Sequence, residues 1–108
     1  MNTLPQAIAD YIEAANAHAP TRVAACFHTD GTVLDEGNVR RGRDEIEAWS
    51  ADTAERYGAT IEPIGLAEAD GRHMLRADVR GDFPGSPVTL AFNFLLQAGS
   101  IRSLEIKP

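Results

Sequence analysis

The chain has 108 residues, 44% of them apolar and 24% charged, with a formal net charge of −6 and a pI of about 4.9. This length and balance predict one folded domain and exclude a disordered chain and a multidomain protein. Because a negative field repels phosphate backbones and anionic lipid headgroups, we expect neither nucleic acid nor a membrane as a partner.

Cysteine and metal-ligand patterns narrow the class further. Cys26 is the only cysteine, so one chain can form neither an internal disulfide nor a multi-cysteine metal site. His, Asp and Glu do not occur at metal-ligand spacings, and we expect no metal and no cofactor. The first residues show no basic leader, and no apolar run approaches the roughly 18 residues of a membrane span. A cytoplasmic protein is therefore expected.

Two helices are predicted at the start of the chain. Thr3 and Gln6 have the spacing of a capping box, and the apolar residues that follow recur at helical spacing. Tyr11 lies in the middle of that apolar stripe. Pro20 suits the first turn of a second helix over residues 20–28, because its fixed φ is helical. The two helices should form a hairpin.

A strand is predicted over residues 30–35, and it ends on two adjacent acids. The period of two places Val33 and Asp35 on the same face. Asp35 either turns inward to do chemistry or accepts backbone N–H groups in the turn toward Gly37, a common role for aspartate. Glu36 points the opposite way and is expected to be solvated.

A third helix is predicted from about Arg43 to Tyr57. Asp44 and Glu45 complement its N-terminal dipole, and Gly58 is placed to end it. The residues expected on its buried face are Ile46, Trp49, Thr53 and Tyr57.

The period of the apolar pattern changes from about 3.6 to about 2 residues near residue 60, which predicts a mainly antiparallel sheet. The first strand covers residues 59–69 and is interrupted at Pro63 or Gly65, where an edge position or a bulge is expected. Residues 100–108 form the last strand. Three helices should cover one face of this curved sheet.

Two further strands alternate more clearly. In residues 72–81 the inward positions begin at His73, which is expected to be solvated because it starts the strand. Residues 88–97 follow a proline–glycine turn and point Phe92 and Phe94 inward.

The order of elements resembles one known superfamily. The phrases "YIEAANAHA", "CFHTDGTVLDEG", "GRDEIEAW" and "GSIRSLEI" are similar to the SnoaL-like, or nuclear transport factor 2-like, proteins, which include ketosteroid isomerase and polyketide cyclases. The resemblance covers essentially the whole chain. It implies the α+β, cystatin-like cone, with three N-terminal helices packed on a curved, mainly antiparallel sheet. It implies no single activity, because this scaffold hosts isomerases, dehydratases, cyclases and non-enzymatic binders.

Two side chains match the isomerase branch of this superfamily. Tyr11 falls where that branch has its oxyanion-binding tyrosine, and Asp35 falls where it has its general base. Such chemistry needs a carboxylate to lift a proton α to a carbonyl and a phenol to bind the oxygen as charge builds. The second oxyanion donor of ketosteroid isomerase, a protonated aspartic acid, corresponds to Phe92 here. Phenylalanine cannot donate, which weighs against steroid isomerisation because one lost donor costs about 10²–10³ in rate.

The inward-facing apolar residues around this pair are expected to bind a small apolar molecule. The predicted ligand-binding residues are Phe27, Val33, Trp49, Phe92 and Phe94. Plain core packing is the alternative for each of them. The cluster from Arg40 to Arg43 is either a solvated rim or an anchor for an acidic substituent.

Two functions stay open at this point. The first is a cofactor-free isomerase or cyclase acting on a small carbonyl compound, favoured by Tyr11 and Asp35. The second is a non-catalytic small-ligand-binding or dimerisation domain, favoured by the narrow cavity expected from Phe92 and Trp49.

The outward face of the sheet predicts a homodimer. It mixes apolar residues with both signs of charge, which suits a two-fold interface where the same patch meets itself. The resemblance also implies dimerisation through this surface. The residues expected to face outward are Met74, Arg76, Asp78, Arg80, Thr89, Ala91, Asn93 and Leu95.

Overall fold

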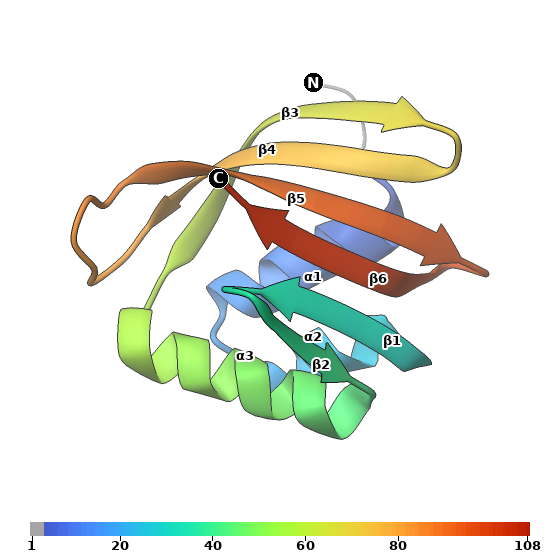
Figure 1. The fold of residues 1–108 in the computed structure, drawn as a ribbon, viewed down its shortest axis with the longest axis horizontal. Coiled ribbons are helices and arrows are strands. Elements are labelled where there is room, and N and C mark those ends of the chain that lie inside the picture. The colour runs from blue at the N-terminus through green and yellow to red at the C-terminus, as the bar shows by residue number, and fades with distance from the viewer. Residues whose placement is uncertain (1–3) are drawn as a thin grey trace.

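The computed structural model describes residues 4–108, so Thr3 of the predicted capping pair lies outside the described residues. None of the helices within this range is long and apolar enough to cross a membrane. The helices and strands, drawn in Figure 1, are α1 (Gln6–Asn16), α2 (Pro20–Ala25), β1 (Phe27–Asp35), β2 (Asn38–Arg41), α3 (Arg43–Tyr57), β3 (Thr60–Ala69), β4 (Arg72–Arg80), β5 (Val88–Gln97) and β6 (Ser100–Lys107).

The six strands form one mixed sheet in the order β2-β1-β6-β5-β4-β3. β1 and β6 run parallel, with Val33 opposite Leu104, and the other neighbouring strands are antiparallel. The sheet curves, with α1 and α2 behind it and α3 beside β1 and β2 in Figure 1. The predicted α+β class is confirmed, with a sheet that is mixed rather than purely antiparallel.

The start of the sheet differs from the prediction in two places. The second helix ends at Ala25, three residues early, because Phe27 pairs with Ile101 and opens β1. The short strand β2 was not predicted. It follows a two-residue turn in which Glu36 and Gly37 have positive φ angles of 53° and 76°, as a tight hairpin requires. Helix α3 then follows β2 along the chain and packs against α2 as well as against β1 and β2.

Later elements follow the sequence pattern closely. Helix α3 begins at Arg43 and ends at Tyr57, where Gly58 takes the left-handed conformation with φ of 53°. In β3 the pairing with β4 shifts between Pro63 and Gly65, so the predicted bulge is confirmed. β3 is an edge strand, and the Asn16 side chain bonds both the N–H and the carbonyl of its Ile61.

The core lies between the concave face of the sheet and the helices. Its largest fully buried side chains are Phe27, Phe94, Ile8, Ile46, Leu75, Ile101, Leu104, Val23 and Val33. Burying each such side chain stabilises the fold by about 1.5–3 kcal/mol. The Tyr11 ring meets Phe27 and Phe94 edge-on, with centroid distances of 6.2 and 5.6 Å. These two contacts fix the Tyr11 ring within the core.

Candidate functional site

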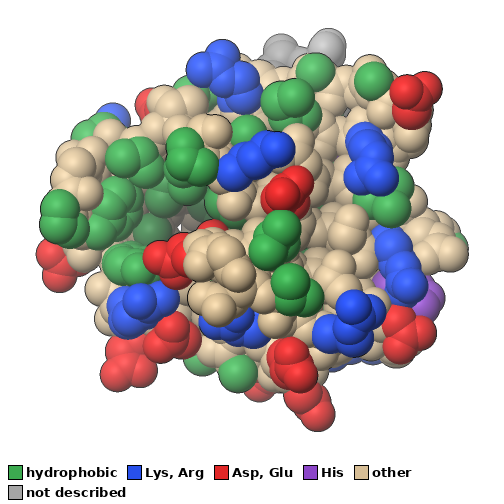
Figure 2. All heavy atoms as spheres, in the orientation of Figure 1, with side chains coloured by type: hydrophobic (Ala, Val, Ile, Leu, Met, Phe, Trp, Pro, Cys, Tyr) green, Lys and Arg blue, Asp and Glu red, His purple; other side chains and the backbone are tan. Residues whose placement is uncertain are grey.

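A cavity of about 580 Å³ lies where the helices leave one end of the concave face uncovered. Its walls come from the second halves of α1 and α3, from Val23 of α2, from the ends of β1, β4 and β6, from the first halves of β3 and β5, and from the β4–β5 loop. Figure 2 shows the hollow at the left, between apolar side chains and with acidic side chains at its lower edge. The volume falls within the roughly 300–1,000 Å³ typical of small-molecule sites, so the cavity is wider than the sequence predicted.

The structure divides the predicted site residues into two groups. Tyr11, Asp35, Trp49 and Phe92 line the cavity. The other predicted ligand-binding residues, Phe27, Val33 and Phe94, do not line it and are 0, 0 and 1% exposed in the core. Phe27 and Phe94 do point inward, as the alternation of their strands predicted. They contact the Tyr11 ring instead of the cavity, so an inward direction alone does not make a residue ligand-binding.

Tyr11 presents a free hydroxyl to the cavity. The residue is only 2% exposed, and its hydroxyl makes no hydrogen bond to another of residues 4–108. Burial, and to a lesser degree the charge of Asp35, raises the pKa of Tyr11 above its usual value. The phenol therefore keeps its proton and can donate a hydrogen bond to a bound molecule.

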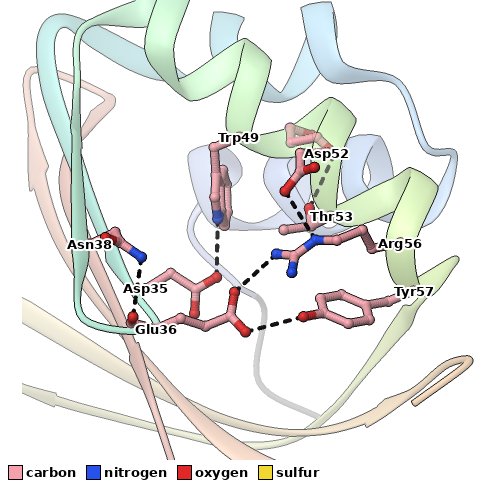
Figure 3. A network of polar contacts seen from close by, with 9 residues as sticks. Asp35, Glu36, Asn38, Trp49, Asp52, Thr53, Arg56 and Tyr57 are labelled. Atoms are coloured by element: carbon pink, nitrogen blue, oxygen red, sulfur yellow. Dashed lines mark hydrogen bonds and ion pairs between the residues drawn. The ribbon is translucent and has the colours of Figure 1, made fainter.

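Asp35 is held in place by a partner that the sequence did not predict. The Trp49 indole Nε1–H donates a hydrogen bond of 3.0 Å to Asp35 Oδ2, as Figure 3 shows. Trp49 is 7% exposed and belongs to α3, whereas Asp35 ends β1. This bond fixes the carboxylate at the cavity wall.

The environment makes Asp35 a stronger base than a solvated aspartate. Burial raises the pKa of its carboxyl group, and the negative charge of Glu36 raises it further. The Trp49 hydrogen bond and the positive charge of Arg40 lower the pKa of Asp35 but do not cancel the effect of burial. A base of raised pKa gains driving force for taking a proton from carbon.

Glu36 is half-exposed, as expected, but it also lines the cavity with Asp35, which corrects the expectation that it points the opposite way. Its Oε2 accepts a hydrogen bond of 3.1 Å from the Tyr57 hydroxyl, and its Oε1 lies 3.2 Å from Nη2 of Arg56 (Figure 3). The alternation of β1 ends before Glu36, because the positive φ angles of Glu36 and Gly37 turn the chain. Asp35 and Glu36 thus face the same cavity from successive positions.

Several wall residues had no signal in the sequence. His18 Nε2 lies 3.0 Å from the carbonyl oxygen of Ala59, and since a carbonyl only accepts, Nε2 carries the hydrogen. Phe83 reaches the cavity from the β4–β5 loop, where its ring meets that of Tyr57 edge-on at 5.8 Å. Ser50, 8% exposed, follows Trp49 on α3. The path of the β4–β5 loop places Phe83 at the cavity, and the rotation of α3 about its axis places Ser50 there. Neither the loop path nor the helix rotation can be predicted from the local sequence.

The remaining polar candidates lie away from the cavity. His73, expected to be solvated, has a side chain only 12% exposed, with Nε2 at 3.2 Å from Glu68 and Nδ1 buried without a partner among residues 4–108. In the basic cluster, the Arg43 side chain donates to the Phe27 carbonyl, and no arginine of the cluster lines the cavity, so an anchoring role is not supported. No group of three His, Cys, Asp or Glu side chains within the described range is arranged to hold a metal ion.

Comparisons with known proteins agree with this architecture. The family model described as a SnoaL-like domain matches residues 8–100. No curated protein sequence matches the chain. Among solved structures, a candidate polyketide cyclase from Sinorhizobium meliloti is 32% identical, with a TM-score of 0.92 over 96% of this chain and 95% of that one.

Two more distant structures share the fold. A protein from Sphaerobacter thermophilus is 25% identical, with a TM-score of 0.81 over 94% of this chain and 91% of that chain. A protein from Catenulispora acidiphila, described as having a ketosteroid isomerase-like fold and solved in complex with trimethylamine, is 21% identical. Its TM-score is 0.87 over 98% of this chain and 87% of that chain.

Proposed function

Because the chain belongs to the SnoaL-like domain family, we propose that it is a cofactor-free isomerase or cyclase that moves a proton on a small carbonyl compound. Asp35 is the base and Tyr11 is the oxyanion donor. The observation that carries this proposal is the pairing, on the walls of one cavity, of a carboxylate of raised pKa with a buried phenol that has no hydrogen-bond partner among residues 4–108.

The proposed reaction begins when the substrate carbonyl oxygen accepts a hydrogen bond from Tyr11. Asp35 then takes a proton from the carbon next to the carbonyl, and the C–H electrons move into an enolate whose negative oxygen Tyr11 stabilises. The protonated Asp35 returns the proton to a carbon of the enolate, or the enolate carbon attacks a second carbonyl in a ring closure and the alkoxide that forms takes the proton from Asp35. Apolar walls such as Phe92 exclude water and so strengthen the hydrogen bond from Tyr11 to the substrate oxygen.

The relative from Sinorhizobium meliloti supports the cyclase half of this proposal. That protein is described as a candidate polyketide cyclase, and it matches almost the whole of both chains. Activity does not follow from fold alone, so the proposal depends on the two side chains rather than on the likeness.

A second function is favoured by one observation. Phe92, 3% exposed, occupies the wall where a second oxyanion donor would stand, and it cannot donate. A single donor is sufficient for binding a carbonyl compound without turnover. The alternative is therefore a non-catalytic domain that binds a small ligand.

Exchange of α-hydrogens in deuterium oxide separates the two functions. We choose 2-tetralone, a bicyclic ketone with acidic α-hydrogens that is small enough for the cavity. If the proposal holds, the protein accelerates deuterium incorporation over buffer of the same pD, and the rate saturates with ketone, as followed by proton NMR. Shifted ketone resonances that report binding, without any acceleration, would instead identify the binding domain.

We also propose that two copies of the chain pair through the outer face of the sheet, where Figure 2 shows apolar and charged side chains intermixed. Met74 is 45% exposed there, and a second copy would cover its apolar side chain. Under a two-fold axis, Arg76 of one copy can meet Asp78 of the other.

If two copies pair in this way, light scattering at micromolar concentration should give a mass twice the 11.6 kDa of one chain. Ala91→Glu combined with Leu95→Glu should give a folded monomer, because it buries new carboxylates without partners in the interface. Circular dichroism checks that the variant is folded. A wild-type monomer, or a variant that still dimerises, would exclude this interface.

A further inference from the structure

The cavity offers opposite hydrogen-bonding chemistry at its two ends. At the inner end Tyr11, 2% exposed, presents a donor that has no partner among residues 4–108. At the mouth Asp35 and the half-exposed Glu36 present carboxylate oxygens. The Tyr57 hydroxyl gives its hydrogen to Glu36, so its oxygen is left as an acceptor. A molecule that satisfies both ends must accept a hydrogen bond at one end and donate at the other.

Charge at the mouth favours a cationic donor over a neutral one. Arg56 is shared between Glu36 at 3.2 Å and Asp52 at 3.0 Å, and it does not line the cavity. Lys107 does line the cavity, but it is 58% exposed and its amino group lies 3.8 Å from Glu105. Arg56 therefore balances only one of the two carboxylates Glu36 and Asp52, and Lys107 faces Glu105. Among residues 4–108 no cation lies in hydrogen-bond contact with Asp35, so the mouth keeps a net negative charge.

We propose that the natural ligand carries a protonated amine, held at the mouth by Glu36 and the Tyr57 oxygen, together with the carbonyl group that Tyr11 binds. The carbonyl group in this ligand rests on the function proposed above. The amine rests only on the carboxylates and the Tyr57 oxygen at the mouth of the cavity. The substrate class is thus a small amino ketone.

Aromatic rings around the mouth suit the same group. Trp49, Tyr57 and Phe83 all line the cavity, and ring faces attract organic cations when water is excluded. One face of Tyr57 already carries the Arg56 guanidinium at 4.7 Å, which shows that this ring accepts a cation. The acidic protein, with a net charge of −6, also attracts cations from solution.

Three matched aryl ketones test the proposal at pH 7. They are 1-[4-(aminomethyl)phenyl]ethanone, which is cationic, 1-[4-(hydroxymethyl)phenyl]ethanone, which is neutral, and 4-acetylbenzoate, which is anionic. Dissociation constants come from NMR shift titrations of the wild-type protein. We expect the amine to bind about three- to fivefold more tightly than the alcohol, the scale of one partly exposed ion pair, and the anion to bind weakest. The preference should shrink as salt is added.

The variant Glu36→Gln tests where the amine is held. Its preference for the amine over the alcohol should fall close to one, because the amide keeps an acceptor oxygen but loses the charge. Glu62→Gln, which removes the same charge from an exposed position on β3 outside the cavity wall, should keep the wild-type preference. Equal binding of the amine and the alcohol to the wild-type protein would overturn the proposal, and so would an amine preference that survives in Glu36→Gln.

These titrations need no turnover, so they stand apart from the test of catalysis. An amine preference lost only in Glu36→Gln, with no acceleration of α-hydrogen exchange, would support the amine site and refute the enzyme. Accelerated exchange of 2-tetralone with no preference among the three ketones would refute the amine site and leave the enzyme standing.

Discussion

Replacing Asp35 with asparagine is expected to slow α-hydrogen exchange of 2-tetralone by about 10²–10⁴, the range that a positioned general base contributes. An amide cannot take the proton. Its Oδ1 can still accept the hydrogen bond from Trp49 Nε1, so the wall of the cavity should keep its shape. The measurement is the exchange rate per protein at saturating ketone. Asp70→Asn, an exposed aspartate in the β3–β4 turn, is the matched control and should exchange as the wild type does.

The same substitution should not destabilise the fold. Because burial raises the folded-state pKa of Asp35, the folded protein holds that proton more tightly than the unfolded chain does. Stability contributed by this group is therefore lost as the pH rises from the unfolded pKa through the folded pKa. At pH 7 the ionised carboxylate costs stability, and Asp35→Asn removes that cost. The melting temperature at pH 7 should equal or exceed that of the wild type. A variant that melts earlier while exchanging normally would make Asp35 a structural strand end.

Local signals account for what could be predicted of the fold. Helix α3 was placed from its acidic first turn and from Gly58, which needs no information from distant parts of the chain. The bulge in β3 follows from a proline and a glycine in one strand, at Pro63 and Gly65. The hairpin between β1 and β2 was missed because its first turn residue, Glu36, rarely adopts positive φ.

The site was predictable in its parity but not in its contacts. The period of two placed Asp35 on the inner face, and the helical stripe placed Tyr11 there. Parity does not say which part of an inner face is filled and which part is hollow, so Phe27 and Phe94 were assigned to a ligand that they do not face. The hydrogen bond from Trp49 joins two elements across an unpredicted hairpin, and only the assembled fold brings its atoms together.

Replacing Tyr11 with phenylalanine is expected to slow exchange by about 10²–10³, the cost of one oxyanion donor. The ring stays, so its edge-on contacts with Phe27 and Phe94 stay as well. Because the hydroxyl has no partner among residues 4–108, its removal breaks no bond within that range, and the melting temperature should not fall. Exchange kinetics and thermal unfolding are measured on the same preparation.

The pairing of these two measurements decides what the Tyr11 hydroxyl does. A core tyrosine bonded to a buried acceptor would lose stability as phenylalanine, by about 1–3 kcal/mol for the acceptor left unpaired, and would keep its exchange rate. An oxyanion donor shows the reverse, because its partner exists only while the ketone is bound and is strongest when the enolate oxygen carries charge. Unchanged exchange in Tyr11→Phe would therefore remove Tyr11 from the reaction, whatever happens to the melting temperature.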